Sequence, residues 1–227
     1  MTVGLAISQC FTALCCLCRN EAVAMRFCSL VCLTVLLAIP VASYAAPGSA
    51  LPAELGEHQR VLVVDKTKAR AHLYQQGTLA KSYEIGLSQV AGRKEKEGDL
   101  KMPEGQYRVV EKLQGPFDSS KDWSKAYLGT RWLRLDYPNV VDAARGLKAG
   151  LIKQAEFDAI AAATRLGKAT PANTALGGGI GIHGWTSAGW KDDESRALTW
   201  GCVSMHAADL EEIFDILRLG DVVLIQP

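Results

Sequence analysis

The sequence lacks an excess of charge of either sign. Its 227 residues carry 25 Lys plus Arg against 24 Asp plus Glu, which gives a formal net charge of +1. This balance excludes a strongly basic protein that binds the phosphate backbone of nucleic acids. It also excludes a chain with a strongly acidic, solvent-exposed tail. Hydrophobic residues make up 48% and charged residues 22%, proportions typical of a globular protein rather than a disordered one.

Cysteine is almost absent outside the N-terminal region. Six of the seven cysteines fall within the first 32 residues, and Cys202 is the seventh. None of the six follows the lipobox pattern, because Cys32 is preceded by Val31 and lies too early in the chain. We therefore do not expect a lipoprotein.

Residues 25–45 have the layout of a secretory signal peptide. Arg26 precedes an apolar run over 27–42, and Ser43 and Ala45 occupy the −3 and −1 positions of a cleavage site. The run is shorter than the roughly 20 residues of a membrane-spanning helix, so we expect cleavage at residue 45 rather than an uncleaved anchor. Residues 1–24 fit poorly ahead of such a segment, and we interpret them as an extension before a start at Met25. The expected location is the periplasm or cell envelope.

The remaining chain, 46–227, is one domain by length, with a linker over 46–59 and a folded domain over 60–226. We expect it to be a monomer without a cofactor. Cys202 is its only cysteine. Exported proteins usually pair their cysteines, so a single thiol in an oxidising compartment calls for a functional reason.

The hydrophobic pattern predicts a mainly β domain. Short β-rich runs bounded by turn residues predict strands at 60–65, 69–75, 79–87 and 106–111, a short one ending at His183, and a buried final one at 221–226. The intervening loop over 92–99, charged in both signs, is interpreted as solvated rather than as gripping a substrate.

Two helical regions interrupt this β pattern. Residues 142–167 predict a helical insertion that Gly167 closes. Near the C-terminus, Leu210, Ile213 and Leu217 share one face of an amphipathic helix. Ser204 is its expected N-cap. The fold class is thus mainly β, with this insertion and a C-terminal helix and strand.

A formal G-x-G-x-x-G occurs at Gly179, Gly181 and Gly184. A dinucleotide site needs a helix directly after such glycines, so that the N-terminus of the helix faces the pyrophosphate. Residues 185–190 are predicted to form a loop, and we do not expect a nucleotide cofactor.

The residues best suited to chemistry lie around His183 and Cys202. Cys202 directly precedes the expected helix start, where the helix dipole favours the reactive thiolate. The backbone amides of Trp200, Gly201 and Cys202 are candidates for an oxyanion site. His183, at a strand end, is suited to take and return the thiol proton. The alternative is an inert buried cysteine and a core histidine.

These residues resemble the catalytic signature of the L,D-transpeptidases, the YkuD-type domains that remodel bacterial peptidoglycan. That signature is a His, a spacer, and then Ser or Thr, His, Gly and Cys; here fifteen residues separate His183 from Thr199, and Gly201 and Cys202 follow. The stretch 86–107 is also similar to the family, through Lys94, Gly98-Asp99 and Pro103-Glu104-Gly105, as are 137–139 and 174–178.

The resemblance implies a β-sandwich or barrel-like domain in which Cys202 is the nucleophile and His183 the general base and acid. The Gly184 carbonyl would orient the His183 ring, and Thr199, Ser204 and Trp185 are possible substrate contacts. The implied reaction attacks the carbonyl between an L-centre and a D-centre of a peptidoglycan stem peptide, forms a thioester, and passes the acyl group to an amine.

Two positions depart from the family pattern. Trp200 replaces the usual His, and Ser204 replaces the usual Arg or Asn, which puts the substrate in doubt more than the chemistry.

Three other interpretations of the function stay open. With water as acceptor the same site is an L,D-carboxypeptidase or a peptidase that releases a wall-attached protein. The second is a peptidoglycan-binding module without catalysis, in which the five tryptophans would contact the ligand. A zinc site from His183, Cys202 and His206 lacks a fourth protein ligand, so no metal is expected.

Overall fold

The computed structural model describes residues 51–115, 117, 128–184 and 197–227. Within these residues the chain forms nine strands, three α-helices and one short 3-10 helix. In chain order they are η1 (Ala53–Leu55), β1 (Arg60–Asp65), β2 (Arg70–Gln75), β3 (Thr78–Ser88), β4 (Gly105–Gln114), β5 (Arg131–Leu135), α3 (Val140–Lys148), α4 (Gln154–Arg165), β6 (Gly181–Gly184), β7 (Ala197–Thr199), β8 (Val203–Met205), α5 (Ala207–Ile216) and β9 (Val222–Gln226). The expected signal peptide lies outside the described residues.

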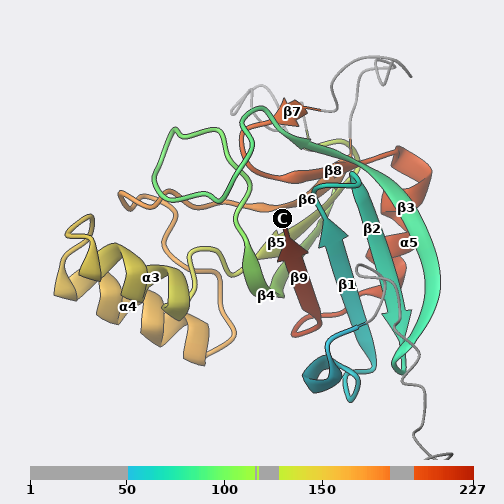
Figure 1. The fold of residues 1–227 in the computed structure, drawn as a ribbon, viewed down its shortest axis with the longest axis horizontal. Coiled ribbons are helices and arrows are strands. Elements are labelled where there is room, and N and C mark those ends of the chain that lie inside the picture. The colour runs from blue at the N-terminus through green and yellow to red at the C-terminus, as the bar shows by residue number, and fades with distance from the viewer. Residues whose placement is uncertain (1–50, 116, 118–127, 185–196) are drawn as a thin grey trace, which may run out of the picture. The chain divides into compact units, whose positions relative to one another are not determined.

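The strands form one sheet that closes on itself (Figure 1). Its order is β2-β1-β9-β4-β5-β6-β8-β3-β7, and an additional pairing of β2 with β3 closes a ring of eight strands. Most neighbours run antiparallel, whereas β1 with β9, β6 with β8, and β3 with β7 run parallel. The prediction of a mainly β, barrel-like domain is confirmed.

The first strand, β1, shows why the sheet closes around a core. Leu62 and Val64 point into the main cluster of buried side chains, while Val61 and Val63 pack with Leu55 in a second cluster on the other face. A strand buried on both faces reads as a continuous hydrophobic run, as β1 does. Leu55 lies in η1, so part of the expected linker over 46–59 packs on the barrel.

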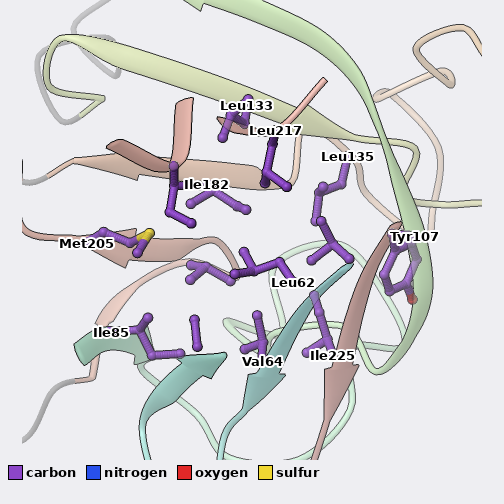
Figure 2. Close-up of a cluster of buried hydrophobic side chains, with 14 of the residues drawn as sticks. Leu62, Val64, Ile85, Tyr107, Leu133, Leu135, Ile182, Met205, Leu217 and Ile225 are labelled. Atoms are coloured by element: carbon purple, nitrogen blue, oxygen red, sulfur yellow. The ribbon is translucent and has the colours of Figure 1, made fainter. Parts of the chain in front are cut away.

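Apolar side chains from most strands of the ring meet inside the barrel (Figure 2). Helix α5 adds its apolar stripe to the same cluster, through Leu210, Ile213 and Leu217, all of which are fully buried. On its outer side, Glu212 pairs with Lys81 and accepts a hydrogen bond from the Tyr83 hydroxyl at 3.1 Å, both on β3. The amphipathic helix predicted from these leucine and isoleucine positions is confirmed.

The start of α5 differs from the prediction. Ser204 is not the N-cap: it lies within β8 and is fully buried, and the helix begins only at Ala207, with His206 as its cap residue. The reason is tertiary, because Ser204 pairs with Gly86 on β3 and with His183 on β6. The sheet takes up the residues that a local capping rule assigned to the helix.

The helical insertion is two helices rather than one, and α3 and α4 pack on each other (Figure 1). Asn139 caps α3 through its side chain, which accepts from the backbone N–H groups of Val141 and Asp142. Gly150, at a φ of 70°, lies in the connection, and Gly167, at 61°, follows α4 as predicted. Strand β5 was not predicted, because Arg131 and Arg134 interrupt its short apolar pattern.

None of the helices within the described ranges has the length and apolar character needed to cross a membrane.

The packing of α5 on the barrel can be tested with a matched pair of truncations. We expect Ile213→Ala to lower the free energy of unfolding by about 2–4 kcal/mol, because it removes a fully buried side chain from the core. Leu219→Ala, at a position 63% exposed, is expected to change it by less than about 0.5 kcal/mol. Urea denaturation of both variants measures the difference, and equal effects would contradict this packing.

Candidate active site

His183 and Cys202, nineteen residues apart in sequence, are brought together by two parallel strands. In the pairing of β6 with β8, His183 lies opposite Ser204, and Ile182 lies opposite Val203. The latter two side chains are fully buried in the barrel, which holds the register. Cys202 directly precedes β8, so it lies beside the start of β6.

The orientation of the His183 ring is fixed by its own strand. The side chain is 4% exposed, and its Nδ1 lies 2.6 Å from the carbonyl oxygen of Gly184. A carbonyl only accepts, so the neutral ring carries its proton on Nδ1 and leaves Nε2 as the nitrogen that takes up a proton. The structure thus contains the Gly184 contact that the family resemblance implied, and this contact makes Nε2 the acceptor nitrogen of the neutral ring.

The turn before Cys202 is braced by Thr199. Its hydroxyl donates to the carbonyl of Cys202 at 2.7 Å and accepts from the backbone N–H of Gly201 at 3.3 Å. The Thr199 side chain is 5% exposed, so it shapes the turn rather than offering a surface to a substrate. The Gly201 N–H already has a partner, which weakens its expected role as an oxyanion donor.

Gly201 is required at its position by the backbone and by its neighbours. Its φ is 143°, and a Cβ there would lie 2.8 Å from the carbonyl oxygen of Lys101. A side chain would therefore force the turn away from Lys101. The glycine of the Gly-Cys pair lets the chain approach the loop that contains Lys101.

Cys202 is a partly exposed residue, and it is a free cysteine. Its sulfur lies 3.8 Å from the carbonyl oxygen of Gly179. Burial of the sulfur among protein atoms raises the pKa of the thiol to about 11, although a Gly181 backbone N–H and the charge of Lys94 act in the opposite direction. The thiol is therefore protonated at neutral pH in the resting site. The expected help from the α5 dipole is not available directly, because β8 separates Cys202 from the helix.

The charged loop over 92–99 is not simply solvated. Lys94 is 4% exposed, and its ammonium lies 2.8 Å from the Asp99 carboxylate and 3.0 Å from the Lys96 carbonyl. Burial acts to raise the pKa of Asp99, but hydrogen bonds from the backbone and from Lys94 hold it below its ordinary value. Sequence reasoning missed this buried pair, since the neighbouring exposed charges conceal it; the glycines at either end of the segment were the available signal.

The other predicted site residues differ in how far they are accessible to a substrate. Ser204 is fully buried and its hydroxyl has no hydrogen-bond partner, so direct contact with a substrate is not supported. Trp200, two residues before Cys202, is 57% exposed. Trp185 lies outside the described residues. Among the residues that the structure places, His183, Cys202 and His206 do not form a group of three metal ligands.

A comparison with protein families matches the part of the chain that contains these residues. The model of the YkuD family, described as the L,D-transpeptidase catalytic domain, matches residues 59–225. The chain belongs to this family. The matched segment contains all described strands except the last residue of β9, and it includes His183 on β6 and Cys202 directly before β8.

Solved structures similar to this YkuD domain include Bd1075 from Bdellovibrio bacteriovorus, at 19% identity and a TM-score of 0.48, covering 74% of this chain and 48% of that one. The helical cell shape determining protein Pgp2 from Campylobacter jejuni has 23% identity and a TM-score of 0.49, with 74% and 47% covered. An L,D-transpeptidase from Stackebrandtia nassauensis has 13% identity and a TM-score of 0.44, with 81% and 62% covered. The chain thus spans about half the length of the first two. No curated protein matches it.

The brace formed by the Thr199 hydroxyl can be removed without changing the shape of the side chain. We expect Thr199→Val to lower the free energy of unfolding by about 1–3 kcal/mol, because the Cys202 carbonyl and the Gly201 N–H lose their shared partner. Thr199→Ser keeps the hydroxyl and is expected to cost less than about 1 kcal/mol. Denaturant unfolding compares the two variants, and a fully stable Thr199→Val would show that the brace is dispensable.

The Lys94–Asp99 pair predicts a pH-dependent contribution to stability. Asp99→Asn is expected to lower the free energy of unfolding by about 3–5 kcal/mol at neutral pH, because it leaves a buried ammonium without its counter-charge. The folded-state pKa of Asp99 lies below its ordinary value of 3.8. The contribution is therefore fully present above that value and is lost as the pH falls through the folded-state pKa. Unfolding curves at neutral and acidic pH measure this, and a difference that grows on acidification would contradict it.

Proposed function

We propose that this YkuD domain is a cysteine-dependent acyltransferase that acts on peptidoglycan stem peptides, with Cys202 as nucleophile and His183 as general base and acid. The observation that carries the proposal is the pairing of β6 with β8, which places Cys202, directly before β8, on the chain segment that neighbours a histidine with a fixed tautomer. Membership of the L,D-transpeptidase catalytic family supplies the substrate class.

In the first step the Cys202 sulfur attacks the carbonyl carbon between an L-centre and a D-centre of the stem peptide. His183 Nε2 takes the thiol proton as the S–C bond forms, and gives it to the departing amine as the C–N bond breaks. The raised pKa of Cys202 supports proton removal during the attack rather than a thiolate that exists beforehand. The products are a thioester on Cys202 and a free amine.

In the second step an acceptor resolves the thioester. An amine from a second stem peptide attacks the thioester carbonyl, His183 removes the amine proton, and the Cys202 sulfur leaves and regains a proton. If water attacks instead, the same atoms give a free carboxylate and the reaction is hydrolysis. The transpeptidase is the function that we propose, and hydrolysis is the competing outcome that the assay below separates.

A groove of about 460 Å³ beside the turn is our candidate for holding part of the stem peptide. It is lined by the end of β3 and the residues after it, over 87–92, and by the ion pair of Lys66 with Glu104. Gln89 in its wall donates its backbone N–H to the Thr199 carbonyl at 3.0 Å. One wall of the groove is therefore hydrogen-bonded to the first residue of the turn that carries Cys202.

The location that we propose is the periplasm or cell envelope, where peptidoglycan lies. This rests on the family and on the signal-peptide pattern of residues 25–45. A peptidoglycan-binding module without catalysis remains the alternative to an enzyme, and it would not need a thiol at Cys202.

The reaction can be tested by incubating the purified protein with muropeptides that carry tetrapeptide stems and analysing the products by mass spectrometry. We expect cross-linked or amine-exchanged stems from the wild type, and a loss of more than about a thousandfold in rate in Cys202→Ala, because the thioester cannot form. His183→Ala is expected to lose rate by about a hundredfold or more through the missing base.

The controls for this assay separate the competing functions. Thr199→Ser, which keeps the brace of the turn, is expected to stay active and shows that a variant near the nucleophile does not abolish activity by itself. Products with shortened stems only would identify a hydrolase. Full activity in Cys202→Ala would overturn the proposed nucleophile, and binding without turnover by the wild type would favour the binding module.

A further inference from the structure

The loop over 94–101 touches both segments of chain that flank the Cys202 sulfur. On one side, Gly177 packs against it so closely that a Cβ there would lie 3.3 Å from the Glu97 Cα and 3.4 Å from the Lys94 Cε. Two residues further on, the Gly179 carbonyl contacts the thiol. On the other side, Gly201 packs against the Lys101 carbonyl. The loop therefore packs against the segments around Gly179 and Gly201, which lie on the two sides of the proposed nucleophile Cys202.

Within this loop the Lys94 ammonium is buried and held in one place. Its partners are the Asp99 carboxylate at 2.8 Å and the Lys96 carbonyl at 3.0 Å. Asp99 is itself fixed, because it accepts backbone N–H groups from Glu95, Lys96 and Lys101. A buried ion pair adds little stability compared with a well-packed apolar pair, since both charges lose their hydration. A buried charge held in one place also acts electrostatically on the groups around it, because the surrounding protein screens it less than water does.

We propose that Lys94 is a positioning residue for the Cys202 thiol: its ammonium, held by Asp99, sets a fixed positive charge near the sulfur and favours the negative charge that forms on the sulfur as it attacks. This inference rests on the proposed role of Cys202 as nucleophile. It assigns to the loop an electrostatic part in the reaction, where the sequence had suggested a solvated segment.

The charge of Lys94 acts against the burial of the sulfur. Burial raises the pKa of Cys202, and the positive charge of Lys94 lowers it. The other titratable groups nearest the thiol are His183 on β6 and His206 at the start of α5. The loop itself adds the exposed Glu95, Lys96 and Glu97, together with Asp99 and Lys101. Neither the segment 177–181 nor the turn 199–202 carries another charged side chain.

The electrostatic and the purely structural role of Lys94 predict opposite changes in Cys202. If Lys94 supplies charge, its removal raises the pKa of the thiol further, and Cys202 reacts more slowly. If Lys94 only holds the loop in place, its removal loosens the loop and exposes the sulfur, so the pKa falls towards that of an ordinary cysteine and Cys202 reacts faster.

The test measures alkylation of Cys202 by iodoacetamide in the full chain at about pH 8.5, near the ordinary pKa of a cysteine. Mass spectrometry of the peptide that contains Cys202 separates it from the other cysteines. We expect Lys94→Met to slow the alkylation by about three- to tenfold, because a rise of one in the pKa lowers the thiolate fraction about tenfold. Lys94→Arg keeps the charge and is expected to stay within about twofold of the wild type.

The matched control is Lys96→Met, which removes an exposed positive charge from the same loop and is expected to leave the rate unchanged. Circular dichroism and thermal unfolding check that each variant is folded, and Lys94→Gln replaces Lys94→Met if the latter is not. An unchanged or faster alkylation in the folded Lys94 variant would overturn the proposal. Because alkylation needs no muropeptide, this outcome is distinct from a failure of the proposed reaction.

Discussion

The parallel pairing of β6 with β8 is the constraint on which the rest of the site depends. In a closed ring of strands neither can slide without breaking pairs on both sides, and the buried Ile182 and Val203 add a cost to any slip. A shift of one residue would turn His183 into the barrel interior, since successive side chains in a strand face opposite sides. The thiol and the imidazole are thus positioned by the whole barrel rather than by local turns.

Polar groups around Cys202 hold the neighbouring backbone and the His183 ring in place. The Thr199 hydroxyl closes the turn, the Gly184 carbonyl holds the His183 ring, and Asp99 gathers three backbone N–H groups of its loop. Each of these groups is buried, where an unpaired polar atom is costly, so each contact favours one conformation strongly. Rigid placement of this kind is what a reaction needs when attack must occur along one direction.

The sequence predicted those features that local patterns determine. Continuous or alternating apolar runs located β1, β2, β3 and β9, the amphipathic stripe located α5, and a single cysteine with a spaced histidine marked the candidate site. The errors arose where tertiary pairing overrides local preference. Ser204 looks like a helix cap but is a strand residue between two partners, β5 is concealed by its two arginines, and the Lys94–Asp99 pair becomes visible only when the loop is folded against Gly177 and Gly201.

The raised pKa of Cys202 suits a thiol that must survive in the oxidising compartment that we propose. The thiolate is the form that oxidants and disulfides attack, so a pKa of about 11 keeps the resting cysteine mostly unreactive. In the reaction that we propose, reactivity then depends on groups that act during the attack, namely His183 as the base and the nearby charge of Lys94. Under this proposal burial protects the Cys202 thiol at rest, and these two side chains lower the free-energy cost of forming the anion when a stem peptide is bound.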